Sequence, residues 1–242
     1  MIIDTATILD ITRFIVGILI LGYASYTDIK TRRAANILWL LMGGIGAVLL
    51  VIQVVFVGIK NPFYLIFVPI MILLMYGFFQ LRLIFGGADA KALMALAILV
   101  PLQPTLGATL PLWGSSVLPA PWVIFSNSVA IFLVIPLSLL LYNLIRRDVA
   151  FPYCLLGYKM SLEKAKQNFI WPLERIDEEG IRHFVYMPKD FDVENELLTF
   201  EQQGITRIWV TPKIPFMIPL LIGFIFTFLI GDILFFLMRA LI

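Results

Sequence analysis

Two residue types that often carry chemistry are almost missing from this chain. Its 242 residues include one cysteine and one histidine. A disulfide within the chain is therefore excluded, and a zinc site built on cysteine and histidine lacks enough ligands. The metalloprotease motif H-E-x-x-H needs two histidines and is excluded as well. We therefore expect no metal and no cofactor, and carboxylates and lysines remain as the reactive groups.

The single histidine, His183, is the only one that could serve a serine–histidine hydrolase. It lies in the most polar part of the chain. Its neighbours Arg182, Phe184, Val185 and Tyr186 are typical of a strand. We interpret His183 as a structural residue.

Charged residues are also scarce. Only 14% of the chain is charged and 61% is apolar, whereas globular proteins average about 25% charged and roughly 45–50% apolar residues. The net charge of +2 is too small to indicate a nucleic-acid partner. Apolar stretches of about 20 residues recur along the chain and predict helices that cross a lipid bilayer. The sequence thus predicts a multi-pass protein of the cell membrane.

Six hydrophobic segments predict an all-α membrane domain with six transmembrane helices. They cover about 11–27, 37–58, 63–84, 89–112, 120–145 and 214–238. Asp4 and Asp10 precede or begin the first segment in place of a positive cluster, so we interpret it as a retained span and not as a signal peptide. The fourth segment is the weakest, because only about 12 residues precede Pro101 and a Pro- and Gly-rich stretch follows. A short, broken or re-entrant span stays open there.

Basic residues gather at alternate junctions between these spans. Lys30, Arg32 and Arg33 follow the first span, Arg82 and Lys91 bracket the junction of the third and fourth, and Arg146 and Arg147 follow the fifth. By the positive-inside rule these junctions are cytoplasmic and the N-terminus lies outside.

A polar segment interrupts the hydrophobic pattern between residues 146 and 212. It holds all but five of the 16 acidic residues, and we predict a small, mostly β cytoplasmic domain inserted before the last helix. The predicted domains are therefore 1–145 (helices one to five), 146–212 (soluble) and 213–242 (helix six). Within the soluble domain we expect a helix over Ser161–Asn168 with Ser161 as N-cap, and strands at Ile181–Met187 and Ile205–Thr211. The acidic run Asp190–Glu196 is interpreted as a solvated loop, and an alternative is that it attracts a basic peptide segment.

Three carboxylates lie at or within the predicted spans: Asp28, Asp89 and Asp232. A carboxylate at membrane depth is unfavourable and is by default a functional hypothesis. The predicted topology places Asp28 and Asp89 together at the cytoplasmic edge and Asp232 toward the outer face, so we assign Asp232 a structural or interfacial role. Aspartyl proteolysis needs two carboxylates at one depth: one, ionised, activates a water, and the other, protonated, polarises the scissile carbonyl.

Each aspartate also has a simpler interpretation. Asp28 could form a surface ion pair with its basic neighbours, which would contribute little to stability. Asp89 could be the N-cap of the helix that follows it. The pair Gly86-Gly87 favours a functional role for Asp89, because two glycines before a membrane helix indicate a close approach of the backbone to another helix or to a substrate.

The sequence around both aspartates resembles a known protease family. Gly86–Asp89 resembles the G-x-G-D motif of intramembrane aspartyl proteases, which include type IV prepilin peptidases, presenilin and signal peptide peptidase, although Ala88 replaces the last glycine. Asp28–Asn36 resembles the other aspartate segment of prepilin peptidases, with Ala35 where proline is usual. The whole chain resembles the archaeal preflagellin peptidases in its six spans, its polar insert, and the segment Ile208–Pro212 before the last span.

This resemblance implies an aspartyl endopeptidase that removes the short basic class III signal peptide from preflagellin or prepilin-like proteins at the cytoplasmic membrane edge. It implies Asp28 and Asp89 as the catalytic pair, with Gly86, Gly87, Lys30, Lys91 and Asn36 supporting the site. One alternative is an ion- or proton-coupled transporter that uses the same carboxylates. Transporter sites usually lie at the bilayer midplane and accompany internal repeats, neither of which the sequence indicates. A non-catalytic assembly factor of a pilus or flagellum is the third possibility.

Overall fold

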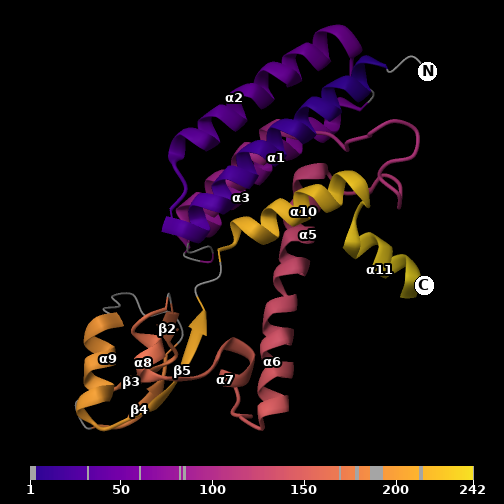
Figure 1. The fold of residues 1–242 in the computed structure, drawn as a ribbon. Helices are drawn as coiled ribbons and strands as arrows, with labels where there is room; N and C mark the ends of the chain where they lie inside the picture. The colour runs from indigo at the N-terminus through magenta and orange to yellow at the C-terminus, as the bar shows by residue number, and fades with distance from the viewer. Residues whose placement is uncertain are drawn as a thin grey trace. The chain divides into compact units, whose positions relative to one another are not determined.

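The computed structural model describes residues 4–31, 33–59, 61–81, 83, 86–168, 170–177, 180–185, 193–212 and 215–241. The chain divides into two compact units, one formed by Met1–Phe132 with Pro215–Ile242 and the other by Leu133–Ile214. In the described residues the first unit is helical, and the strands belong to the second (Figure 1). The division predicted at residue 146 followed hydropathy, whereas this division follows contacts and assigns the helix from Val134 to the second unit.

The first unit is a bundle of mostly apolar helices. They are α1 (Thr5–Thr31), α2 (Asn36–Ile52), η1 (Gln53–Val57, a π-helix), η2 (Pro62–Ile66, a 3-10 helix), α3 (Phe67–Gln80), α4 (Gly87–Leu99), α5 (Ala120–Phe132), α10 (Met217–Leu229) and α11 (Ile233–Leu241). Among the described residues, four continuous helical stretches are long and apolar enough to cross a membrane, namely Thr5–Thr31, Asn36–Val57, Pro62–Gln80 and Ala120–Arg146. The pair α10 and α11, bent by 63°, becomes a fifth if it counts as one span.

The fourth predicted span is shorter than the hydropathy indicated. α4 has 13 residues and rises about 20 Å, less than the roughly 30 Å of a bilayer core. It ends at Leu99, and irregular chain continues to Pro119. Pro101 and Pro104 contribute to this break, because proline lacks the backbone N–H that a helix interior requires. Six crossing helices are therefore not confirmed, and the predicted last span is bent between α10 and α11.

The bundle consists of two helix groups. In the first group α10 packs against α1 and α5, and in the second group α4 packs against α2 and α3. The contact between α2 and α4 is backbone to backbone, because a Cβ on Gly46 would lie 2.6 Å from the Cα of Leu99. In the first group the Phe14 ring of α1 packs against Phe224 and Phe228 of α10. Asp28 therefore belongs to the first group, on α1, and Asp89 to the second, on α4.

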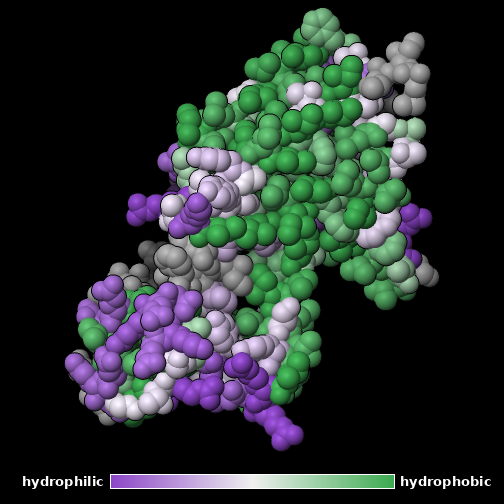
Figure 2. Space-filling model, viewed as in Figure 1, coloured by the Kyte–Doolittle hydropathy of each residue, from purple (hydrophilic) through white to green (hydrophobic). Residues whose placement is uncertain are grey.

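The surface of the first unit is apolar over most of the face in view (Figure 2). Leu19, Leu40 and Leu73, on three different helices, are each about two-thirds exposed. A water-soluble surface seldom carries apolar patches of this extent, whereas the lipid-facing surface of a membrane helix requires them. Polar side chains are concentrated on the second unit.

The second unit combines short strands with helices. Its elements are α6 (Val134–Arg146), α7 (Tyr153–Leu156), β1 (Tyr158–Ser161), α8 (Leu162–Ala165), β2 (Ile170–Pro172), β3 (Glu174–Ile176), β4 (Arg182–Phe184), α9 (Val193–Gln202) and β5 (Arg207–Pro212). One antiparallel sheet has the order β1-β5-β2, with Tyr158 opposite Val210, and a second pairs β3 with β4. Phe200 of α9 is fully buried in the core beside Ile208 and Val210.

The strands predicted in this unit are confirmed in part. β5 covers most of the predicted strand 205–211, and β4 lies inside the predicted strand 181–187, whose last two residues lie outside the described residues. The helix predicted over 161–168 is limited to α8. Ser161 occupies its N-cap position, but within the described residues its side chain makes no capping hydrogen bond.

The loop predicted at 190–196 is wrong from Val193 onward. Residues 190–192 lie outside the described residues, and α9 begins at Val193. Val193, Leu197 and Phe200 recur at helical spacing and turn one face of α9 toward the core. Glu196 is buried and forms an ion pair with Arg175, so it is not a solvated loop residue.

Candidate active site

Asp28 and Asp89 lie where two helix ends meet. Asp28 is in the last turn of α1, and Asp89 is in the first turn of α4. The two helices contact each other, and both aspartates are half-buried. The carboxylates are close enough for their negative charges to interact. Two residues 61 positions apart in the sequence thus meet at one end of the bundle.

Gly86 makes room for the Asp89 carboxylate. Gly86 is the N-cap of α4, so the interpretation of Asp89 as the N-cap is wrong. Oδ2 of Asp89 occupies the space that a Cβ on Gly86 would need. A Cβ on Gly87, by contrast, would only touch the ring of Phe79 at 3.3 Å. The close approach expected at this glycine pair therefore comes from the side chain of Asp89 itself.

The carboxylate of Asp89 accepts no hydrogen bond from any residue that the structure describes. Its position in the first turn of α4 is favourable for a negative charge, because the N-terminus of a helix carries a partial positive charge. A half-buried acidic group beside a second acidic group can receive a water or a peptide group. This arrangement is suited to acid–base chemistry.

A hydrogen bond between Lys91 and Asn36 links α4 to α2 near the start of both helices. Nζ of Lys91, in the second turn of α4, donates to Oδ1 of Asn36 at 2.9 Å, and Asn36 is the first residue of α2. The sequence indicated both residues separately, and the structure brings them together. Lys30 lies in the last turn of α1, two residues after Asp28. Its ammonium packs over the ring of Tyr26, one turn earlier on the same helix, 4.7 Å from the ring centroid.

Asp232 is held by hydrogen bonds at the bend between α10 and α11. It is 3% exposed. Its Oδ2 accepts from the Ser116 hydroxyl at 2.6 Å, and its Oδ1 accepts from the backbone N–H of Phe235 at 3.1 Å. Asn127 donates to the carbonyl of Gly231 next to it. Both carboxylate oxygens are occupied, as a structural role requires.

Asp10 is a further buried carboxylate, and the sequence interpretation missed it. It lies inside α1 and is 8% exposed, although it was expected before or at the start of the first span. Oδ1 accepts from Nη1 of Arg13 at 2.9 Å, and Oδ2 accepts from the backbone N–H of Thr105 at 2.9 Å. The signal for it was an acid and a base three positions apart within an apolar run.

His183 is exposed on β4, and its Nε2 lies 2.6 Å from Oδ2 of Asp177. Among the described residues, no group of three or more His, Cys, Asp or Glu side chains has the geometry to hold a metal ion.

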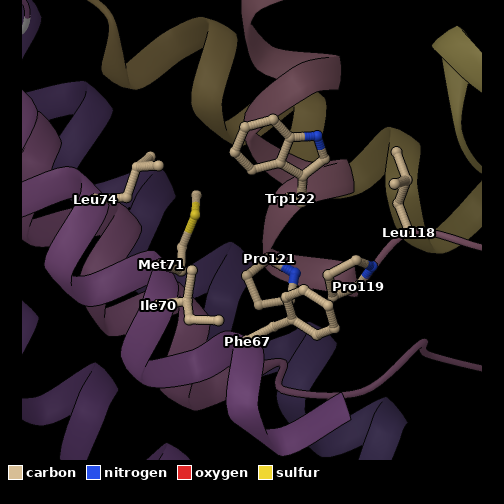
Figure 3. A pocket seen from close by; sticks show the side chains of 8 residues that line it. All are labelled: Phe67, Ile70, Met71, Leu74, Leu118, Pro119, Pro121 and Trp122. Carbon is tan, nitrogen blue, oxygen red and sulfur yellow. The ribbon is translucent and has the colours of Figure 1, made fainter. Parts of the chain in front are cut away.

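An apolar groove of about 250 Å³ lies between α3 and the start of α5 (Figure 3). Phe67, Ile70, Met71 and Leu74 line it from α3, and Pro121 and Trp122 line it from α5. Phe67, Ile70 and Met71 lie in the first half of α3, whereas the chain reaches Asp89 only after the other end of α3. Its lining offers no group that could cleave a bond.

Comparison with known proteins gives matches along nearly the whole chain. Residues 15–145 match the model of the type IV leader peptidase family, and residues 150–233 match the model described as Archaeal Peptidase A24 C-terminus Type II. The chain is 29% identical to the preflagellin peptidase of Methanocaldococcus jannaschii over 90% of its length and 94% of that protein. It is 26% identical to the preflagellin peptidase of Methanococcus voltae over 90% of its length and 95% of that protein.

Proposed function

Because the chain belongs to the type IV leader peptidase family, we propose that it is a membrane-embedded aspartyl endopeptidase acting on preflagellin or prepilin-like proteins. Its task is to remove their short basic signal peptide. The observation that carries this function is the interaction of the Asp28 and Asp89 charges across α1 and α4. The names of the relatives from Methanocaldococcus jannaschii and Methanococcus voltae support preflagellin as the substrate.

In the proposed mechanism the two aspartates share one proton. The ionised carboxylate removes a proton from a water molecule as that water attacks the scissile carbonyl carbon. The protonated carboxyl donates a hydrogen bond to the carbonyl oxygen and stabilises the negative charge that develops there. The tetrahedral intermediate then collapses and its C–N bond breaks, while the carboxyl that took the proton from water gives it to the leaving amine. Two carboxylates this close do not both ionise readily, so the proton belongs to the pair and not to one residue.

The surroundings of the pair support this division of labour. Gly86 leaves space for the Asp89 carboxylate, and the bond between Lys91 and Asn36 holds the beginnings of α4 and α2 together beside it. Lys91 is committed to Asn36 and acts as a positioning residue and not as an acid. No metal ion is required in this scheme.

We further propose that cleavage takes place at the cytoplasmic edge of the membrane. Asp28 lies in the last turn of α1 and is followed by exposed Lys30 and Arg33, and basic residues favour the cytoplasmic side of a bilayer. A substrate helix that lies in the membrane beside α1 and α4 would present the junction with its leader peptide at this level.

The test is cleavage of a preflagellin by the purified protein in lipid vesicles. The wild-type protein is expected to release the leader at one bond, identified by the mass of the product, and EDTA is expected to leave the rate unchanged. Asp28→Asn and Asp89→Asn are each expected to lower the rate by about 10²–10⁴-fold, the usual contribution of one acid–base group.

The matched control is Asp232→Asn, which alters a carboxylate of the same unit that is bound to Ser116. It is expected to cleave at nearly the wild-type rate. If Asp28→Asn or Asp89→Asn cleaves as fast as this control, the two residues are not a catalytic pair. A wild-type protein that cleaves nothing but moves protons or cations across the vesicle would favour the transporter.

A further inference from the structure

Asp10, which is buried, and Asp28, which is half-buried, lie on one face of α1. Asp10 and Asp28 are 18 residues apart in one unbroken helix. At 3.6 residues per turn, 18 residues make five whole turns and about 27 Å, so the two side chains leave the helix in the same direction. Arg13, Gly17, Leu21 and Ala24 between them form the buried stripe of this face. Any rotation of α1 that turns Asp10 turns Asp28 by the same angle.

Both aspartates face the same stretch of chain. Asp28 interacts with Asp89 at the start of α4. Asp10 accepts a hydrogen bond from the backbone N–H of Thr105, six residues after α4 ends at Leu99. The face of α1 is thus fixed against α4 at one end and against the segment that follows α4 at the other.

This second attachment matters because Asp28 and Asp89 belong to different helix groups. α1 packs most extensively against α10 and also contacts α2, whereas its direct contact with α4 is small. The packing of α1 directly against α4 therefore constrains the relative rotation of these two helices only weakly. Apolar contacts are not directional, whereas the bond between Thr105 and Asp10 is.

The Asp10–Arg13 pair is poorly suited to a purely stabilising role. Arg13 is 1% exposed, and its Nε and Nη2 are buried without a hydrogen-bond partner among the described residues. Buried nitrogens without partners are unfavourable, and buried ion pairs can often be replaced by apolar residues without loss of stability. A buried pair that is incompletely satisfied is better explained by the geometry that it imposes than by its contribution to stability.

We propose that Asp10 and Arg13 are positioning residues for the Asp28–Asp89 pair. Arg13 neutralises Asp10 and orients its carboxylate, and Asp10 binds the Thr105 amide. This bond sets the rotation and height of α1 against α4 and so aims Asp28 at Asp89. The inference rests on the proposed function for its consequence in catalysis, but the geometry that it describes can be measured without catalysis.

The experiment measures cross-linking between positions 28 and 89 in the full chain in lipid vesicles. The parent carries Asp28→Cys and Asp89→Cys, with Cys154→Ala to remove the native thiol, and a copper–phenanthroline oxidant forms the disulfide. Two variants of this parent differ in one feature only. Asp10→Asn with Arg13→Met keeps a side-chain acceptor for the Thr105 amide, whereas Asp10→Leu with Arg13→Met removes it.

We expect the Asn variant to cross-link at nearly the parent rate and the Leu variant to cross-link about tenfold more slowly, with both remaining folded by thermal unfolding. Thr105→Pro removes the donor from the other side and is expected to behave like the Leu variant. If the Leu variant cross-links at the parent rate, the inference is overturned. If the Leu variant and Thr105→Pro both fail to fold, the bond is needed for folding and the positioning role is overturned as well.

The same changes made in the enzyme with native aspartates add the catalytic readout. The Leu variant is expected to lower kcat for preflagellin, because Asp28 is no longer aimed at Asp89. KM is expected to change little, because the bond between Asp10 and Thr105 lies about five turns of α1 from the reacting groups. If cross-linking responds as expected but Asp28→Asn still cleaves, the geometry stands and the proposed function fails. If Asp28→Asn is inactive and cross-linking does not respond, the function stands and this inference fails.

Discussion

Asp10 and Asp89, which lie near opposite ends of α1, differ in their hydrogen bonding. At the Asp10 end both carboxylate oxygens are bonded, one to Arg13 and one to the Thr105 amide. At the Asp28 end the neighbouring Asp89 carboxylate receives no hydrogen bond from the described residues and instead lies near a second negative charge. A buried carboxylate with all its bonding capacity occupied fixes structure. One that is left open beside another acid is available for chemistry, and the predictions below test this contrast.

Among the residues around the acidic pair, the largest effect on cleavage is expected from the glycine that accommodates Asp89. Gly86→Ala puts a methyl group where Oδ2 of Asp89 lies, so the carboxylate must move. A displacement of about 1 Å at a catalytic group can cost roughly 100-fold in rate, and we expect a loss of that order in kcat for preflagellin. Gly87→Ala meets only Phe79 and is the control, with a change of a few-fold at most. Equal losses in both variants would show that Gly86 has no special relation to Asp89.

Removing the carboxylate of Asp232, whose two oxygens both accept hydrogen bonds, should lower the stability of the fold and leave catalysis intact. Asp232→Ala leaves the Ser116 hydroxyl and the Phe235 amide without their acceptor. Unpaired buried groups cost about 1–3 kcal/mol, so the free energy of unfolding should fall by that amount. Thermal unfolding in detergent measures it, and kcat is measured on the same sample. A variant of normal stability with a large loss of kcat would contradict the structural assignment of Asp232.

A smaller effect on the cleavage rate is expected from the hydrogen bond between Lys91 and Asn36, which links the starts of α4 and α2. Lys91→Met and Asn36→Ala each remove the 2.9 Å hydrogen bond between these two exposed residues. An exposed bond of this kind contributes less than about 1 kcal/mol, so each variant should cleave only a few-fold more slowly. Because both act through one bond, the double variant should lose no more than either single variant. Losses that multiply would give Lys91 a separate role.

The smallest effect is expected in the second unit, outside the membrane spans. Lys159 donates to Asp148 at 2.8 Å, and this bond lowers the pKa of the Asp148 carboxyl below its ordinary value of 3.8. A lowered pKa in the folded state contributes stability above the ordinary pKa, and this contribution is lost as the pH falls through the lowered value. Asp148→Asn should therefore be slightly less stable than wild type at pH 7 and equally stable at pH 2. A difference that persists at pH 2 would show that the effect is not electrostatic.

The sequence predicted the acidic pair and much of the helical unit because both depend on local signals. Long apolar runs predicted α1, α2 and α3, and the alternation of basic junctions predicted that Asp28 and Asp89 occupy the same end of the bundle. The short length of α4 was harder to predict, because the mean hydropathy of residues 89–112 is apolar whether or not the chain is helical there. The prolines from Pro101 onward were the better evidence there.

Other features could be seen only once distant segments had been brought together. Nothing local shows that Asp10 binds the Thr105 amide, 95 residues away, although its spacing of five turns from Asp28 was present in the sequence. α9 was missed because its acidic residues masked an apolar spacing of four and three positions. The bond between Lys91 and Asn36 depends on the packing of α2 against α4, which single-residue preferences do not encode.

The most direct test of the acidic pair compares single and double variants in one experiment. Single-turnover cleavage of preflagellin is measured for Asp28→Asn, Asp89→Asn and the variant with both changes. Residues that act as one catalytic unit are strongly non-additive, since removal of either already disables the step. The account predicts that all three variants share the same low residual rate. A double variant whose loss equals the product of the two single losses, or a single variant that cleaves at the wild-type rate, would contradict it.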